Sequence, residues 1–90
     1  MLQPRYSRQF KKDYKLAMKR GKNIDRLKQV MSLLIAEQPL PAYCRPHARS
    51  GTLKGVIDVH VESDWLLLYL PGDGTICFER TGTHSDLFGE

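Results

Sequence analysis

The chain has 90 residues, of which 41% are hydrophobic and 27% charged, so it is long enough for one globular domain. Its longest apolar run, residues 65–70, is far shorter than the roughly 20 residues of a membrane-spanning helix, and no apolar signal segment follows Met1, so we expect a cytoplasmic protein. Cys44 and Cys77 are then expected to stay as thiols.

The net charge of +4 hides a division along the chain. Residues 1–36 carry ten Lys or Arg against two Asp, whereas residues 37–90 carry four against eight Asp or Glu. A basic segment on a small domain indicates a polyanionic partner, most often nucleic acid. The alternative is that these side chains only solvate helix surfaces. The candidate RNA- or ribosome-docking residues are Lys11, Lys12, Lys15, Lys19 and Arg20.

In chain order, the first half predicts a strand and two helices. Residues 2–6 form the strand, and Ser7 is a favourable N-cap for a helix that Gly21 ends. Asn23 caps a second helix, which residues 39–41 stop because they include two prolines. Apolar residues at helical spacing give each helix one buried face: Phe10, Tyr14, Ala17 and Met18 in the first, and Ile24, Leu27, Val30, Met31 and Leu34 in the second.

The second half changes to the alternation that is typical of strands. The predicted elements are a loop over 39–51, a strand over 53–61, a turn over 62–64, a strand over 65–70, a hairpin turn over 71–74, a strand over 75–81 and a tail over 82–90. The strand 65–70 is apolar on both faces, so it is expected at the centre of the sheet. The chain is therefore predicted to be one α+β domain over residues 1–90, in the order β-α-α-β-β-β, with the N-terminal strand and helical hairpin packed on a small twisted antiparallel sheet.

Candidate catalytic side chains occur after the helices. His60 and Asp64 flank one turn of the predicted meander, and Arg80 and His84 follow at the end of its last strand. The topology predicts one cleft for these four, with His47 reaching in from the loop before the sheet. Each histidine alone can equally be a surface residue, and Arg80 can simply pair with a neighbouring acid, Glu79 or Asp64.

Such a set of residues suits metal-free RNA cleavage. The 2′-hydroxyl needs a base, the leaving oxygen needs an acid, and the phosphorane between them needs a cation. Histidine, with an ordinary pKa near 6.5, can serve as acid or base near neutral pH, and the arginine fork fits phosphate oxygens. Trp65 and Phe88 offer aromatic rings for stacking bases, although the place of Trp65 on a central strand favours the core.

Metal binding is a second interpretation. Cys44 and His47 have the spacing of a ligand pair, and Cys77, His60 and His84 are possible further ligands. A structural zinc site usually has two closely spaced pairs, and this sequence has one. We therefore expect no metal and no other cofactor.

Two long motifs resemble the YafQ branch of the RelE/ParE toxin superfamily. Residues 60–69 read HVESDWLLLY, similar to that branch's H-V-x-x-D-W-x-L-x-Y, and residues 77–89 contain FERTGTH, similar to its ending. Further similarity lies at residues 53–55 and in the helices. The resemblance implies a RelE-like fold and a ribosome-dependent endoribonuclease, the toxin of a type II toxin–antitoxin system that cuts mRNA and inhibits translation.

The same motifs imply roles for individual residues. The resemblance assigns the catalytic positions to His47, His60, Asp64, Arg80 and His84, and two aromatic positions tied to activity to Trp65 and Phe88. Arg80 would bind the phosphate and His84 would act as general acid or base. His60 and Asp64 would share the other proton transfer or orient the nucleotide, and His47 is an alternative base.

The implied partners are a cognate antitoxin, the mRNA and the ribosomal RNA of the decoding site, with no membrane. Two rival functions share the predicted fold. One is a ParE-like toxin that inhibits DNA gyrase and is not expected to carry these histidines, and the other is a catalytically idle RNA- or ribosome-binding module.

Overall fold

Capping residues determine where the two long helices begin, and a glycine determines where the first one ends. In the computed structural model, which describes residues 1–48 and 55–89, they are α1 (Arg8–Lys19) and α2 (Ile24–Ile35). The side chains of Ser7 and Asn23 cap them, each accepting a hydrogen bond from the backbone N–H three residues on. Gly21 follows α1 with a φ of 73°, the left-handed conformation that glycine adopts without strain. Both predicted caps and the glycine stop are confirmed.

The end of α2 differs from the prediction. The helix stops at Ile35, before either proline is reached, and Glu37 follows in the left-handed region with a φ of 56°. Backbone N–H groups of Glu37 and Gln38 donate to carbonyls of the last turn, so the helix is closed by its own C-terminal hydrogen bonds. In α1, Met18 is also misassigned, because it is 53% exposed rather than buried.

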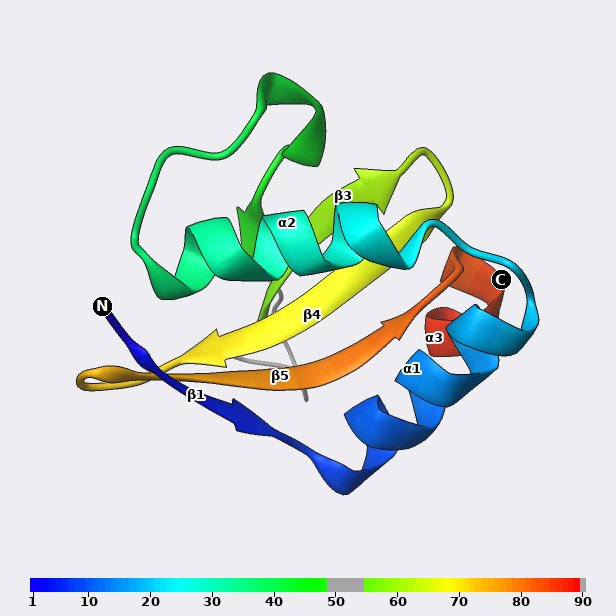
Figure 1. The fold of residues 1–90 in the computed structure, drawn as a ribbon, viewed down its shortest axis with the longest axis horizontal. Helices are drawn as coiled ribbons and strands as arrows, with labels where there is room; N and C mark the ends of the chain where they lie inside the picture. The colour runs from blue at the N-terminus through cyan, green and yellow to red at the C-terminus, as the bar shows by residue number, and fades with distance from the viewer. Residues whose placement is uncertain (49–54, 90) are drawn as a thin grey trace.

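The strands form one five-stranded sheet in the order β1-β5-β4-β3-β2 (Figure 1). Their bounds are β1 (Gln3–Tyr6), β2 (His47–Ala48), β3 (Ile57–Glu62), β4 (Trp65–Pro71) and β5 (Thr75–Gly82). β4 is central, as its two apolar faces predict. The sheet is antiparallel except at one edge, where β1 runs parallel to β5. The predicted antiparallel sheet is present, and the N-terminal strand joins it as a parallel edge, because a long crossover containing the helical hairpin separates β1 from the other strands.

Three elements were not expected. The predicted loop 39–51 contains a short 3-10 helix, η1 (Ala42–Cys44), and the two-residue strand β2. The predicted tail contains a third helix, α3 (His84–Phe88), which begins with a capping box between Thr83 and Asp86. The expected strand start at Leu53 and Lys54, and the loop residues 49–52, lie outside the described residues. Within the described residues, no helix is long and apolar enough to cross a membrane.

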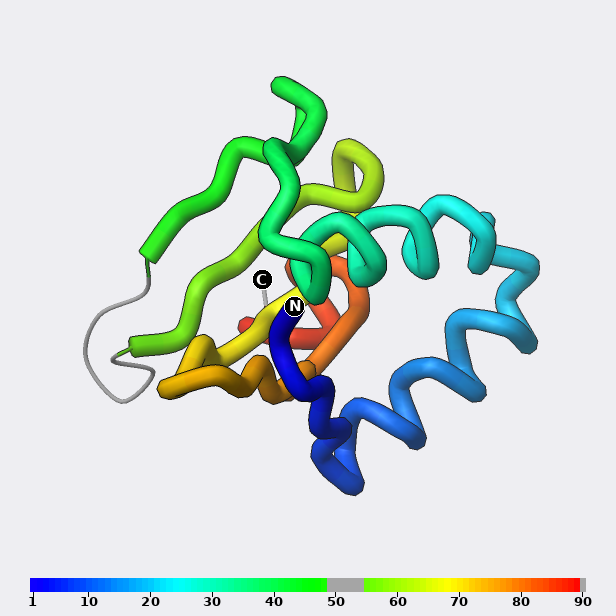
Figure 2. The backbone as a smooth tube through the Cα atoms, turned by 60° about the vertical axis from the view of Figure 1, so that its left-hand side comes forward, coloured from blue at the N-terminus to red at the C-terminus, as the bar shows by residue number. Residues whose placement is uncertain are grey.

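The sheet separates a large core from a small one. α1 and α2 diverge from the turn that joins them, and they contact β5 and β3 respectively (Figure 2). Beneath them lies the main core, which includes Phe10, Leu27, Val59, Leu67 and Phe78. On the other face, Val56, Leu66 and Leu68 form a smaller cluster, against which Leu87 and Phe88 of α3 pack. We call this second face the α3 face.

Candidate functional site

Strand register places the candidate residues on the α3 face. His60 of β3 lies opposite Leu66 of β4, and Arg80 of β5 lies opposite Leu68. Residues directly opposite each other in antiparallel strands point to the same side of the sheet. Because Leu66 and Leu68 pack under α3, His60 and Arg80 also belong to the α3 face.

The same pairing adds His47 and Asp58. His47 lies opposite Asp58, which in turn lies opposite Leu68, so a single row from His47 to Arg80 crosses four strands. Strands are spaced about 4.8 Å apart, so the two ends of this row are roughly 14 Å apart. His47 thus shares the face but lies at its far edge, on a strand rather than in the expected loop. Asp58, 3% exposed, was missed as a candidate although its alternation with His60 could have identified it.

Asp64 and His84 form the closest polar pair on this face. Asp64, in the turn between β3 and β4, has its Oδ1 atom 2.6 Å from Nδ1 of His84 and accepts a 3.0 Å hydrogen bond from the backbone N–H of His84. The hydrogen bond from the His84 ring lowers the pKa of Asp64 below its ordinary value. An ionised carboxylate can only accept, so Nδ1 of His84 donates and Nε2 is left for another partner.

Two further rings surround His84. The ring centroid of His84 is 6.0 Å from the centroid of His60 and 6.5 Å from the centroid of Phe88. The predicted gathering of His60, Asp64 and His84 is therefore present in the structure. Phe88, one turn further along α3, is half-buried and keeps part of its surface open beside His84.

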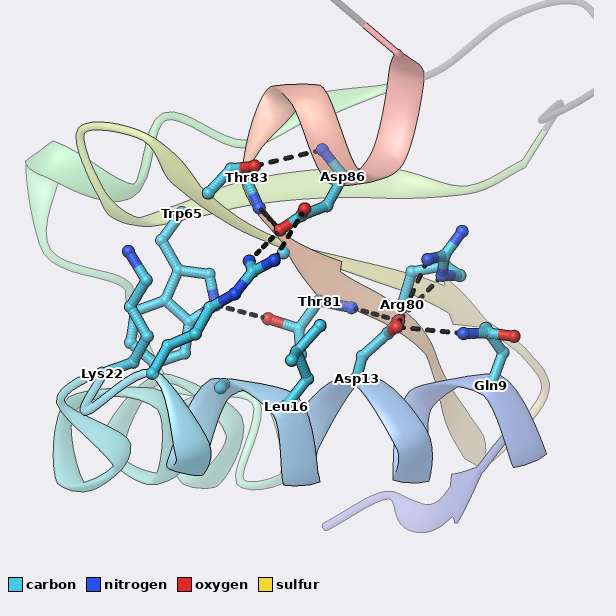
Figure 3. A pocket seen from close by; sticks show the side chains of 12 residues that line it. Gln9, Asp13, Leu16, Lys22, Trp65, Arg80, Thr81, Thr83 and Asp86 are labelled. Carbon is cyan, nitrogen blue, oxygen red and sulfur yellow. Dashed lines mark hydrogen bonds and ion pairs between the residues drawn. The ribbon is translucent and has the colours of Figure 1, made fainter.

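Arg80 does not pair with Glu79 or Asp64. Its Nε and Nη2 atoms instead donate to the carboxylate of Asp13 on α1, at 2.8 and 3.3 Å. Asp13 is buried and also accepts hydrogen bonds from the backbone N–H of Thr81 and the side chain of Gln9 (Figure 3). The hydrogen bond to Asp13 raises the pKa of Arg80 further above its ordinary value. The side chain of Arg80 keeps 35% of its surface exposed.

A second ion pair attaches α3 to the end of α1. Arg20 donates from Nη1 and Nη2 to Asp86, at 2.6 and 3.3 Å (Figure 3). This guanidinium lowers the pKa of Asp86 to about 2. A Cβ atom added at Gly82 would lie only 3.0 Å from Cβ of Asp86, so the glycine permits this close approach of α3. Neither Asp13 nor Asp86 was predicted as part of the site, although Thr83-x-x-Asp86 is a readable capping signal.

Two expected contacts with RNA are not supported by the placement of the side chains. Trp65 is 1% exposed, and its Nε1–H donates to the hydroxyl of Thr81 at 2.8 Å, so its ring belongs to the core and cannot stack a base. Arg20 keeps 43% of its side chain exposed but is paired with Asp86, which balances its charge and reduces what it adds to a docking surface. The four lysines of the predicted docking group, Lys11, Lys12, Lys15 and Lys19, are exposed on α1.

Metal ligands do not gather in the part of the chain that the structure describes. Within residues 1–48 and 55–89, no group of three or more His, Cys, Asp or Glu side chains is placed to hold a metal ion. Cys44 is fully buried in the main core. Burial raises the pKa of the Cys77 thiol to about 11. Both cysteines are free thiols, Cys44 in the core and Cys77 half-buried beside Glu79.

Comparisons with known proteins agree with this geometry. Residues 2–89 match the model of a family described as the bacterial toxin of a type II toxin–antitoxin system, YafQ. The mRNA interferase toxin YafQ of Escherichia coli K12 is 52% identical over 85 residues, which cover 93% of this chain and 92% of the relative.

Solved structures are similar over almost the whole chain. The crystal structure of YafQ from E. coli BL21(DE3) superposes with a TM-score of 0.93 at 48% identity, covering 99% of this chain and 100% of the other. YafQ in a crystal structure of the E. coli DinJ–YafQ complex gives a TM-score of 0.92 at 49% identity, with the same coverage. A metal-bound toxin from Helicobacter pylori gives 0.91 at 36% identity, covering 98% and 100%.

Proposed function

Because the chain belongs to the YafQ family of toxins of type II toxin–antitoxin systems, we propose that its α3 face is the site at which it cuts RNA. The protein is an mRNA interferase, an endoribonuclease that inhibits translation by cleaving mRNA. The main support for this location is the Asp64–His84 hydrogen bond beside His60. Arg80 lies on the same face of the sheet.

His84 is placed to exchange a proton with the RNA. Asp64 accepts from Nδ1–H and so fixes both the tautomer and the orientation of the ring, as the aspartate does for the histidine of a catalytic triad. Nε2 is then the atom that gives or takes the proton. Asp64 is thereby a positioning residue for His84 rather than a second proton carrier.

His60 supplies the other proton transfer in this proposal. Cleavage needs a base at the 2′-hydroxyl and an acid at the leaving 5′-oxygen, on opposite sides of one phosphorus atom. The two ring centroids are 6.0 Å apart, so both imidazoles can reach oxygen atoms of one phosphodiester that lies across them. Each group is expected to contribute roughly 10²- to 10⁴-fold in rate.

Arg80 stabilises the phosphorane. Asp13 uses the Nε–H and one N–H of Nη2, so three of the five guanidinium N–H groups are left for phosphate oxygens. Because the guanidinium is fixed on one edge, the remaining edge is presented in a set orientation. His47 is roughly 14 Å along the row from Arg80, so we assign it to a neighbouring part of the RNA.

Mapping the 5′ ends of mRNA in cells that express the toxin tests this assignment. Wild type should produce cuts at defined positions within codons, and His84→Ala and Arg80→Ala should abolish them. Lys28→Ala, on the exposed surface of α2, serves as the control. Growth arrest with DNA breaks and intact mRNA would instead indicate a ParE-like gyrase poison.

The partner that controls the toxin is an antitoxin, as in the DinJ–YafQ complexes of its E. coli relative. We further propose that the substrate is mRNA on translating ribosomes in the cytoplasm, and that the exposed lysines of α1 contact ribosomal RNA. Reversing the charges of Lys11, Lys12 and Lys15 together should weaken ribosome binding and reduce its dependence on salt concentration. If the salt dependence of ribosome binding does not change, another surface of the toxin contacts the ribosome.

A further inference from the structure

A pocket next to His60 has no role in the proton transfers described above. It has a volume of about 310 Å³ and is lined by Tyr43, Arg45, His60, Glu62 and Ser63. Three of these residues follow one another along the end of β3 and its turn, and η1 packs against β3 to bring in the other two. The pocket therefore lies beside the end of β3, on the side away from β4 and Arg80, and it meets the α3 face at His60.

The ring of Tyr43 is held in place from one side. The guanidinium of Arg26 lies 4.2 Å from the ring centroid, and Nε of Arg26 donates to the backbone carbonyl of Val61. Tyr43 is nevertheless 38% exposed and lines the pocket. An aromatic ring that is fixed on one face and open to a pocket is suited to stacking a planar group at little entropic cost.

Charged groups at the pocket complement an RNA strand. Arg45 is exposed and has a φ of 41°, a left-handed conformation that is strained for a residue other than glycine and that is commonest at functional sites. Its guanidinium is a ready partner for a phosphate of the backbone. Glu62 brings a carboxylate to the pocket, which accepts hydrogen bonds when ionised and cannot donate them.

We propose that this pocket binds a nucleobase of the mRNA adjacent to the cleaved bond, and that it selects a base with an amino group on its Watson–Crick edge. Tyr43 stacks on the base, Glu62 accepts from the amino group, and Arg45 binds the neighbouring phosphate. Adenine, cytosine and guanine carry such a group, whereas the only donor on this edge of uracil, N3–H, lies between two carbonyl oxygens that the carboxylate repels. The inference rests on the proposed function, because His60 forms the wall shared with the catalytic residues.

Single-turnover cleavage of mRNA bound to purified ribosomes tests the proposal, with each of the four nucleotides placed in turn at the positions flanking the cut. Tyr43→Ala should raise the toxin concentration that gives the half-maximal rate by roughly 5- to 150-fold, the effect of removing one stacking side chain. Tyr43→Phe should restore most of that loss, because it keeps the ring. Thermal unfolding of each variant separates loss of fold from loss of binding.

The second arm tests selectivity. Glu62→Gln replaces the acceptor by an amide that both donates and accepts, so it should admit uridine at one flanking position. Glu37→Gln makes the same change of charge beside the N-terminus, where the carboxylate contacts the Met1 amino group, and should leave the preference as it is. The proposal is wrong if Glu62→Gln and Glu37→Gln show the same nucleotide preference at the positions flanking the cut. It is also wrong if a folded Tyr43→Ala variant cleaves as the wild type does. If wild type does not cut mRNA, the proposed function itself fails.

Discussion

Replacing Asp13 with Asn tests whether α1 positions the arginine of the site. The Asp13 carboxylate accepts four hydrogen bonds, from Gln9, Thr81 and two nitrogens of Arg80. Asn keeps one acceptor oxygen and turns an NH₂ group toward donors. Hydrogen bonds to charged groups are worth about 1.5–3 kcal/mol, and Arg80 can rehydrate because a third of its side chain is exposed. We expect the free energy of unfolding to fall by about 2 kcal/mol, less than for a fully buried pair.

The effect on catalysis should be larger than this loss of stability implies. A guanidinium released from Asp13 is misplaced by the order of 1 Å, which can cost about 100-fold in rate. Affinity for RNA should not weaken, because Asp13→Asn removes a negative charge near the site. Urea denaturation gives the stability, and single-turnover cleavage against toxin concentration separates the maximal rate from binding.

A double-mutant cycle gives the refuting result. In the Arg80→Ala background, Asp13→Asn should have little further effect on cleavage, because the group that it positions is gone. If the two substitutions act independently on the rate, or if Asp13→Asn cleaves as fast as wild type, then Asp13 does not act through Arg80.

Three further changes test the elements around His84. Asp64→Asn replaces the carboxylate by an amide whose NH₂ group can face Nδ1 and favour the wrong tautomer of His84, so cleavage should fall by about 10²-fold or more while Asp73→Asn, in the hairpin turn, has no effect. Gly82→Ala places a Cβ atom 3.0 Å from Asp86, so it should shift α3 and lower cleavage at least about tenfold in rate assays with only a small change in melting temperature. The pKa of Asp86 is lowered to about 2, so its ionised form stabilises the fold above about pH 4 and this contribution is lost as the pH falls toward 2. Acid unfolding followed by Trp fluorescence should therefore show wild type more stable than Asp86→Asn at neutral pH and equal to it near pH 2; parallel curves at all pH values would contradict this.

Much of the fold could be predicted because its signals are local. Ser7, Asn23 and Gly21 mark helix ends whatever packs nearby, and alternation in β3 assigns the residues before its bulge, from Ile57 to His60, to a face. The parallel pairing of β1 with β5 could not be predicted from these signals, because it joins Gln3 to Thr75 and depends on how the helices cover the sheet. The capping box of α3 is visible in the sequence, but the helix is only five residues long. It is too short for apolar residues to repeat at helical spacing, so it was not predicted.

The site was predictable to the extent that its residues lie close together in sequence or in a recognisable motif. His60, Asp64 and His84 belong to two motifs that the β3–β4 turn and the end of β5 bring together. Asp13 was missed because its contact with Arg80 joins residues 67 positions apart and a helix to the edge of a sheet. Trp65 was assigned to RNA by resemblance, while its place on a central strand correctly favoured the core.

β5 makes the fold and the candidate site depend on one segment. It carries Arg80, leads directly to His84 and provides the edge on which β1 is laid. Without this strand the chain has neither the guanidinium nor the partner for its own first residues. A substitution that displaces β5 should therefore disable cleavage and destabilise the fold together.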